Sequence, residues 1–254
     1  MKRIFQLILM LSISMAVVLP AWTQDPAPDE ILKSMSTYLG GLSKFSVSAD
    51  VDSEIIDLSG QKLQFSSSVE IAAERPGKLN ISRQGAFSDM EMIYGGKTLT
   101  LYNKESNAYA QMENLGTIDD AINSFQVDMG LDAPGADLFY SDAYGGLSSG
   151  VVSSTYLGTD YVNGAECHHL AFREAKTDWQ LWVRVGDAPL PMKYIITTKW
   201  LTGAPQYSVR FRNWNTNPQL KAGRFEFSIP AGARKLERLE ANQMGELVIE
   251  KVEK

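Results

Sequence analysis

The sequence predicts a β-rich α+β fold, a curved antiparallel sheet (an unclosed β-barrel) with helices packed in its concave side. Two runs of residues, 45–112 and 151–214, contain segments in which apolar and polar side chains alternate. Such alternation is typical of antiparallel strands that bury one face and expose the other. Between the runs, the apolar residues of 117–129 recur at helical spacing. We expect one domain over residues 24–254, because no linker or change of composition divides the chain.

The first expected element is an amphipathic helix at 28–39. Ile31 and Met35 fall on its apolar face, together with neighbours at helical spacing. Asp25 is expected to cap this helix, and Gly40-Gly41 is expected to end it.

Twelve segments of the two runs are expected to be strands. In the first run they are 45–55, 63–71, 78–83, 90–94, 98–102 and 109–112, and in the second 151–157, 167–173, 179–185, 192–200, 206–214 and 224–227. Glycine-containing turns separate many of them, which favours a meander of neighbouring hairpins.

The insert between the two runs is expected to be helical. Thr117 is a good N-cap for a helix at 117–129, and the acidic residues that follow it favour the helix dipole. A second short helix is expected after Pro134, and Gly145-Gly146 is expected to open a flexible connection. Five glycines between residues 130 and 150 suit a movable lid.

Residues 1–23 indicate a signal peptide. A basic start is followed by a charge-free apolar run from Ile4 to Leu19, which is short for a spanning helix and suits secretion. Cleavage is expected after Thr23 or after Ala21, and the alternative is an uncleaved membrane anchor. No cysteine lies near the cleavage site, so we expect a soluble, non-lipidated periplasmic protein that is not integral to the membrane.

Charge and cysteine content exclude several classes of protein. The chain has 24 basic and 30 acidic residues, a net charge of −6, and no cluster of Lys and Arg. It therefore lacks the positive surface of a nucleic-acid binder and the basic patch that holds a protein on anionic lipid. The single cysteine excludes an intramolecular disulfide.

Cys167-His168-His169 is the one cluster that resembles a catalytic or metal site. On a strand, Cys167 and His169 share a face, as two metal ligands or a thiolate and its base would. Metal sites need three or four protein ligands, and the chain has neither a second cysteine nor a third histidine. We favour a structural role and expect no metal and no cofactor, with a hydrolase using Cys167 or His169 as the weaker alternative.

A second motif, G-x-S-x-G around Ser148, matches the nucleophile elbow of hydrolases. That elbow needs a strand before the serine and a helix after it. The sequence predicts the reverse order here, which favours a simple glycine-serine turn.

The mature chain has four tryptophans, all between residues 179 and 214. They can pack adjacent strands together, or they can line one wall of a cavity, since ligand pockets are mainly apolar and aromatic. The candidate ligand-binding residues are Trp179, Trp182 and Trp200, together with Phe125 and Met129 from the helical insert.

Several segments resemble one known family. Cys167–Arg173, Asp178–Val183, Pro189–Pro191 and Lys44–Val47 are similar to those of predicted periplasmic proteins of unknown function, a family related to the LolA/LolB lipoprotein-carrier superfamily. The resemblance implies an unclosed barrel with helices in its concave side and a hydrophobic cavity between them. The carriers bind acyl chains in that cavity.

The leading hypothesis is therefore a non-catalytic periplasmic protein that binds a lipid-like or other hydrophobic ligand between sheet and helices. The first alternative is a structural or docking module of the cell envelope, with a protein partner and no ligand.

Overall fold

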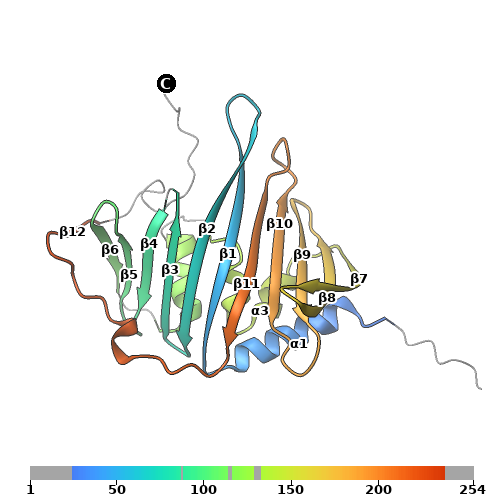
Figure 1. Ribbon diagram of the computed structural model, residues 1–254, viewed down its shortest axis with the longest axis horizontal. Coiled ribbons are helices and arrows are strands. Elements are labelled where there is room, and N and C mark those ends of the chain that lie inside the picture. The colour runs from blue at the N-terminus through green and yellow to red at the C-terminus, as the bar shows by residue number, and fades with distance from the viewer. Residues whose placement is uncertain (1–24, 87, 114–115, 129–132, 238–254) are drawn as a thin grey trace, which may run out of the picture.

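The computed structural model describes residues 25–237 except 87, 114–115 and 129–132. Within these residues, twelve strands form one curved sheet that is not closed into a barrel (Figure 1). Most of the helical segments pack on one face, here called the concave face, and the other is called the convex face. The predicted fold class is confirmed.

The strands form two antiparallel meanders. The first contains β1 (Lys44–Ile56), β2 (Lys62–Glu74), β3 (Lys78–Gly85), β4 (Ser88–Tyr94), β5 (Leu99–Asn103) and β6 (Ala108–Met112). The second contains β7 (Ser153–Val162), β8 (Ala165–Arg173), β9 (Thr177–Arg184), β10 (Pro191–Thr198) and β11 (Gln206–Asn215). These eleven strands correspond to eleven of the segments that alternation predicts.

The two meanders join through antiparallel pairing of β1 with β11, which makes the order β12-β6-β5-β4-β3-β2-β1-β11-β10-β9-β8-β7. The two-residue β12 (Arg234–Lys235) pairs in parallel with β6 and forms one edge, and β7 forms the other. On the convex face of the joint, Arg212 of β11 lies 3.0 Å from the carboxylate of Asp50 on β1. Polar side chains thus cover the solvent side of the central strands.

The helical elements are short. They are α1 (Pro28–Gly41), α2 (Ile118–Asn123), the π-helical turn η1 (Ser124–Asp128), the 3₁₀ turns η2 (Ala136–Phe139) and η3 (Ala222–Phe225), and α3 (Ala143–Ser148). In the described ranges, no helix combines the length and the apolar composition that crossing a bilayer requires.

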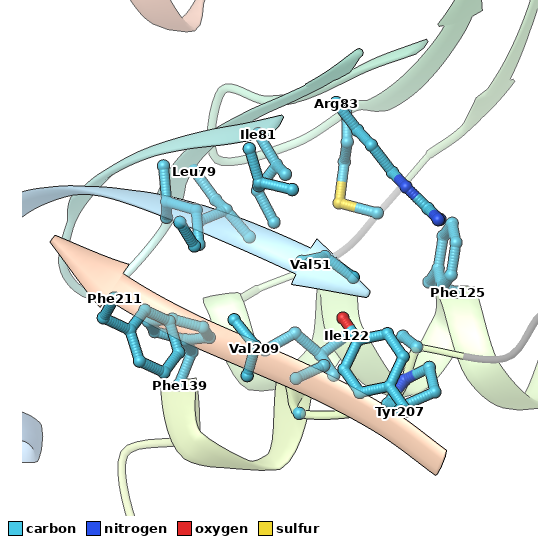
Figure 2. Close-up of a pocket in the computed structure, with 18 residues that line it drawn as sticks. Val51, Leu79, Ile81, Arg83, Ile122, Phe125, Phe139, Tyr207, Val209 and Phe211 are labelled. Carbon is cyan, nitrogen blue, oxygen red and sulfur yellow. The ribbon is translucent and has the colours of Figure 1, made fainter. Parts of the chain in front are cut away.

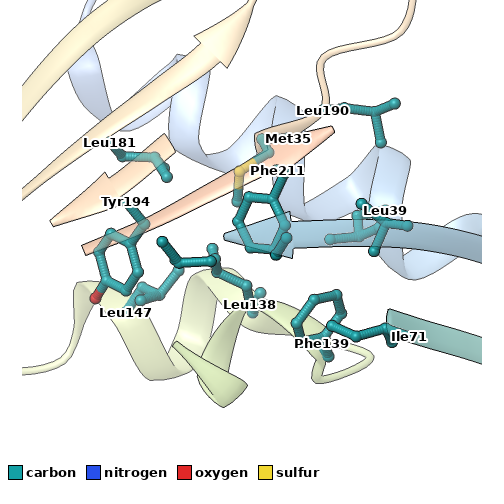
Figure 3. Packing of buried hydrophobic residues seen from close by; sticks show 14 of the residues in the cluster. Met35, Leu39, Ile71, Leu138, Phe139, Leu147, Leu181, Leu190, Tyr194 and Phe211 are labelled. Carbon is teal, nitrogen blue, oxygen red and sulfur yellow. The ribbon is translucent and has the colours of Figure 1, made fainter. Parts of the chain in front are cut away.

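The main hydrophobic core lies between the concave face and the helices (Figure 3). Leu32, Met35 and Leu39 of α1 are fully buried there, and so are Phe45 of β1 and Phe211 of β11. Because alternate strand residues point to one face, the apolar half of each alternating segment supplies the sheet side of this core.

A smaller apolar cluster lies on the convex face. It contains Val162, Cys167, Trp182 and Met192. Trp182 is one residue from Leu181, which belongs to the main core, so the strand pleat directs the two side chains to opposite faces.

Three sequence predictions of local structure were wrong. The expected strand at 224–227 is instead the turn η3 and its continuation, in which the Phe227 ring packs against the rings of Tyr102 and Tyr109 with centroids 5.5 Å and 5.2 Å apart. Gly145-Gly146 lies inside α3, where the Asp142 side chain accepts a hydrogen bond from the Gly145 amide over 3.1 Å. Asp25 does not cap α1, whose N-cap is Ala27.

The packing of α3 also bears on the predicted lid. Ala143 and Leu147 of α3 are buried, and a β-carbon at Gly40 of α1 would lie 2.3 Å from the carbonyl oxygen of Ser141. The later part of the glycine-containing insert is therefore packed against α1 as part of the core. Residues 1–24, where the signal peptide is predicted, lie outside the described residues.

Candidate ligand cavity

An apolar cavity of about 180 Å³ lies between the concave face and the helical insert (Figure 2). Strands β1 to β4 and β11 supply one wall, and α2, η1, η2 and the residues just before η2 supply the other. Its lining includes Val51, Ile81 and Val209 from the sheet, and Ile122 and Phe125 from the insert. This is a concave apolar site of the kind that holds small hydrophobic ligands.

Small residues leave this space unfilled. Ala49 of β1 and Ala136 of η2 line the cavity with only a methyl group each. Gly135 brings the insert close to the sheet, because its φ of +85° is a conformation that favours glycine and a β-carbon there would lie 3.6 Å from the Tyr194 ring. The cavity thus results from short side chains placed where the two layers meet.

Two groups hold the insert in position over the sheet. Thr117 caps α2, since its hydroxyl accepts a hydrogen bond from the Asp120 amide over 3.1 Å while the Asp120 carboxylate accepts one from the Thr117 amide over 2.8 Å. This capping box satisfies two amides that the first helical turn leaves unpaired. Arg75, beyond the end of β2, donates to the carbonyl oxygen of Phe139 in η2 over 2.9 Å.

Two polar side chains line the otherwise apolar cavity, Arg83 of β3 and Tyr207 of β11. The Arg83 Nε donates to the Ser67 hydroxyl over 3.1 Å. Burial raises the pKa of Tyr207 to about 12, although the nearby Arg83 charge acts in the opposite direction. Tyr207 is therefore protonated at neutral pH and can donate a hydrogen bond.

Residues 28–238 match a family described as "Predicted periplasmic protein (DUF2092)". The chain belongs to this family. This finding confirms the resemblance that the sequence shows to predicted periplasmic proteins. No curated protein matches the chain.

Three solved structures are similar in fold. An uncharacterized conserved protein from Thermus thermophilus has 9% identity and a TM-score of 0.49, covering 82% of this chain and 96% of that one. The lipoprotein LppX from Mycobacterium tuberculosis has 13% identity and a TM-score of 0.43, with coverages of 78% and 100%. A LolA superfamily protein from Nitrosomonas europaea has 8% identity and a TM-score of 0.38, with coverages of 76% and 94%.

The four candidate ligand-binding residues that the structure describes are not brought together. Phe125 lines the cavity, and Met129 lies outside the described residues. Trp179 is buried in the main core, where it stacks on Phe172 with ring centroids 3.9 Å apart. Trp182 packs in the convex cluster, and Trp200 is 66% exposed beyond the end of β10. The expected tryptophan wall is not part of the cavity lining.

The reason lies in the pleat and in the strand order. Trp179 and Trp182 are three residues apart on β9, so they point to opposite faces. In the second meander the cavity lining comes from β11, and β9 is two positions away from β11 in the sheet. Nearness in sequence therefore does not place these rings together.

Cys167 and His169 share the convex face of β8, as predicted from the strand period. The Cys167 thiol is fully buried, donates to the Ala165 carbonyl oxygen over 3.4 Å, and has its pKa raised by burial. The His169 ring stacks on Trp182 with centroids 4.0 Å apart and bonds to Gln180 over 2.9 Å. These contacts are those of packed structural residues.

Neither a metal site nor the G-x-S-x-G motif has the geometry that its chemistry requires among the described residues. Over the residues that it describes, no three His, Cys, Asp or Glu side chains gather as metal ligands would. Ser148 is the last residue of α3, so a helix precedes it and β7 follows, the reverse of a nucleophile elbow.

Sequence reasoning missed most of the cavity lining, and Arg83 above all. The position of Arg83 in the sequence could have indicated its role, because Leu79, Ile81 and Arg83 are alternate residues of one strand and point to the same face. A charged residue in the apolar phase of an alternating segment is unusual and marks a position to examine. Tyr207 shares the phase of Val209 and Phe211 in the same way.

Proposed function

We propose that this protein is a non-catalytic periplasmic protein that binds a hydrophobic ligand between its sheet and its helical insert. The observation that carries the proposal is the apolar cavity of about 180 Å³, lined by β1 to β4, β11 and the insert. Family membership supports the periplasmic location, since the family is described as predicted periplasmic.

The size of the cavity limits what can enter it. An engineered apolar cavity of about 150 Å³ binds benzene, so at the same volume per carbon this one accommodates about seven carbons. Each buried methylene contributes about 0.8 kcal/mol, or about 6 kcal/mol for seven of them, before the cost of association is subtracted. We therefore expect weak binding of part of an alkyl chain, with the remainder outside the cavity.

The non-catalytic assignment rests on the surroundings of the candidate nucleophile. The Cys167 thiol is buried and its pKa is raised, whereas a reactive thiol is exposed and has a lowered pKa. His169 bonds to Gln180.

The ligand proposal is tested by a methyl NMR titration with octan-1-ol. Saturable shifts are expected at Val51, Ile81 and Val209, which line the cavity. Val51→Phe should fill the space and weaken binding at least tenfold, whereas Val152→Phe, at a side chain that is 72% exposed, should leave binding unchanged. A wild-type spectrum that does not respond to the alcohol would refute the proposal, and capture of a specific envelope protein would then favour the docking alternative.

The location is tested separately. Export with cleavage after Thr23 or Ala21 predicts a mature amino terminus at Gln24 or Trp22. Amino-terminal sequencing of the protein recovered from periplasm checks this, and an intact Met1 in the membrane fraction would contradict it.

A further inference from the structure

Arg83 is a charged side chain on an apolar surface. It lies on the concave face of β3 in the same phase as Leu79 and Ile81, and it is half-buried. Figure 2 shows its side chain extending from the strand toward the ring of Phe125, at the cavity that both residues line. A guanidinium is costly to remove from water unless a partner compensates its charge.

The residues that the structure describes supply little compensation for the Arg83 charge. In the part of the chain that the structure describes, Arg83 takes part in none of the ion pairs, and its one hydrogen bond is from Nε to the Ser67 hydroxyl over 3.1 Å. Arg212 differs, because its guanidinium donates two hydrogen bonds to Asp50, of 3.1 Å and 3.0 Å. Among the described residues the terminal nitrogens of Arg83 have no acceptor, so an anion can take that place.

Tyr207 offers a second donor at the same cavity. Its hydroxyl points into the space between sheet and insert in Figure 2, and the ring belongs to the lining. Both side chains line the same cavity, and the Arg83 charge lowers the pKa of this hydroxyl against the effect of burial. A guanidinium and a hydroxyl together suit an oxyanion, to which charge-assisted hydrogen bonds are strong.

We propose that the ligand is an amphiphile with an anionic head group, a carboxylate or phosphate that accepts hydrogen bonds from Arg83 and Tyr207 while the alkyl chain occupies the cavity. This inference rests on the proposed function and names the class of its ligand. The chain as a whole carries a net charge of −6, so long-range attraction cannot select an anion. The selectivity must arise locally, at Arg83.

The test compares four ligands with the same eight-carbon chain: octanoate, octyl phosphate, octan-1-ol and octyltrimethylammonium. Dissociation constants are measured on the full mature protein by the methyl NMR titration. At least one anion is expected to bind about tenfold more tightly than the alcohol, and the cation more weakly than the alcohol. The ratio between octanoate and octyl phosphate distinguishes a carboxylate head group from a phosphate head group.

Two variants locate the effect. Arg83→Gln should reduce anion binding about tenfold, so that the preference for the anions over the alcohol is lost, and Tyr207→Phe should reduce anion binding severalfold. Arg210→Gln removes an exposed arginine of β11 and serves as the matched control, with no change expected. The wild-type ligand series is decisive even if a variant does not fold.

The outcomes separate the two proposals. If the anions bind no better than octan-1-ol, or if Arg83→Gln keeps the preference, the head-group inference is wrong while the hydrophobic site stands. If none of the four ligands binds the wild-type protein, the proposed function itself is wrong.

Discussion

The guanidinium of Arg75 donates a hydrogen bond to the carbonyl oxygen of Phe139, with Nη2 and O 2.9 Å apart. This contact joins the residue after β2 to the end of η2, and the Phe139 ring in turn stacks on Phe45 with centroids 5.8 Å apart. Since Phe139 lines the cavity, the bond fixes one of its walls.

Replacing Arg75 with Met should destabilise the protein. The substitution removes a charged donor and leaves the Phe139 carbonyl unpaired, which costs about 1.5–3 kcal/mol. Urea unfolding followed by circular dichroism measures the change in free energy of unfolding. Arg210→Met, at an exposed position, should change it by less than about 0.5 kcal/mol, and equal effects of the two variants would contradict the role of Arg75.

Trp182→Ala should lower stability without affecting the cavity. Trp182 is 5% exposed in the convex cluster and donates from its indole nitrogen to Asp160 over 3.0 Å, so its loss should cost about 3–5 kcal/mol. Octan-1-ol affinity of the folded variant should be unchanged, because the ring lies on the face opposite the cavity. The exposed Trp200→Ala is the control for stability, and weaker alcohol binding in Trp182→Ala would show that the ring acts on the cavity.

Asp137→Asn should stabilise the protein at neutral pH. Burial raises the pKa of Asp137 in the folded state, against a hydrogen bond from Gln126 that lowers it, and the Glu174 charge raises it further. The folded state therefore holds this proton more tightly than the unfolded state, and its stability falls as pH rises from about 4 through the folded pKa. The variant cannot ionise, so its advantage in Tm should be present at pH 7 and absent below about pH 4.

Thermal melts at several pH values check the Asp137 prediction. Asp187→Asn, at an exposed residue of the β9–β10 turn, is expected to show no such pH-dependent gain. If the increase in Tm of Asp137→Asn were the same from pH 3 to pH 7, the variant would act through packing and the explanation by ionisation would be wrong.

The Cys167 thiol should react slowly with a disulfide reagent such as Ellman's reagent. It is fully buried, and burial raises its pKa, so that labelling requires the structure to open. With an opening free energy of about 5 kcal/mol, the rate in the folded state should be on the order of 5000-fold below the rate in urea. Fast labelling of the native protein would instead support the catalytic alternative for this cysteine.

The sheet was predictable from sequence because burial of one face imposes alternation on each strand. Phe45, Val47, Ala49 and Val51 show this directly, since all four are buried on the concave face as the pattern indicates. The short helices were located less well. The segment expected as one helix at 117–129 is α2 followed by the π-helical turn at 124–128, and the segment after Pro134 forms only a 3₁₀ turn at 136–139, whose Phe139 ring stacks on Phe45 of the sheet.

The cavity was less predictable than the sheet, because a cavity depends on which strands become neighbours. Val209 and Val51 lie opposite each other only because β11 pairs with β1, and no local pattern reports that pairing. Phe125 was found from its place on a helical stripe. The tryptophans did not identify the cavity wall. A high number of tryptophans in one region indicates that the region is apolar, and it does not show that their side chains share one face of the sheet.

The pairing of β1 with β11 also constrains the order in which the molecule is assembled. Asp50 pairs with Arg210, 160 residues further along the chain, whereas neighbouring strands within each meander are joined by short turns. Local hairpins form early and distant contacts late, because closing a long loop costs more chain entropy. Since Tyr207 and Val209 of β11 complete the cavity, the first meander alone has no enclosed site, and the capacity to hold a ligand arises only when the two halves of the chain meet.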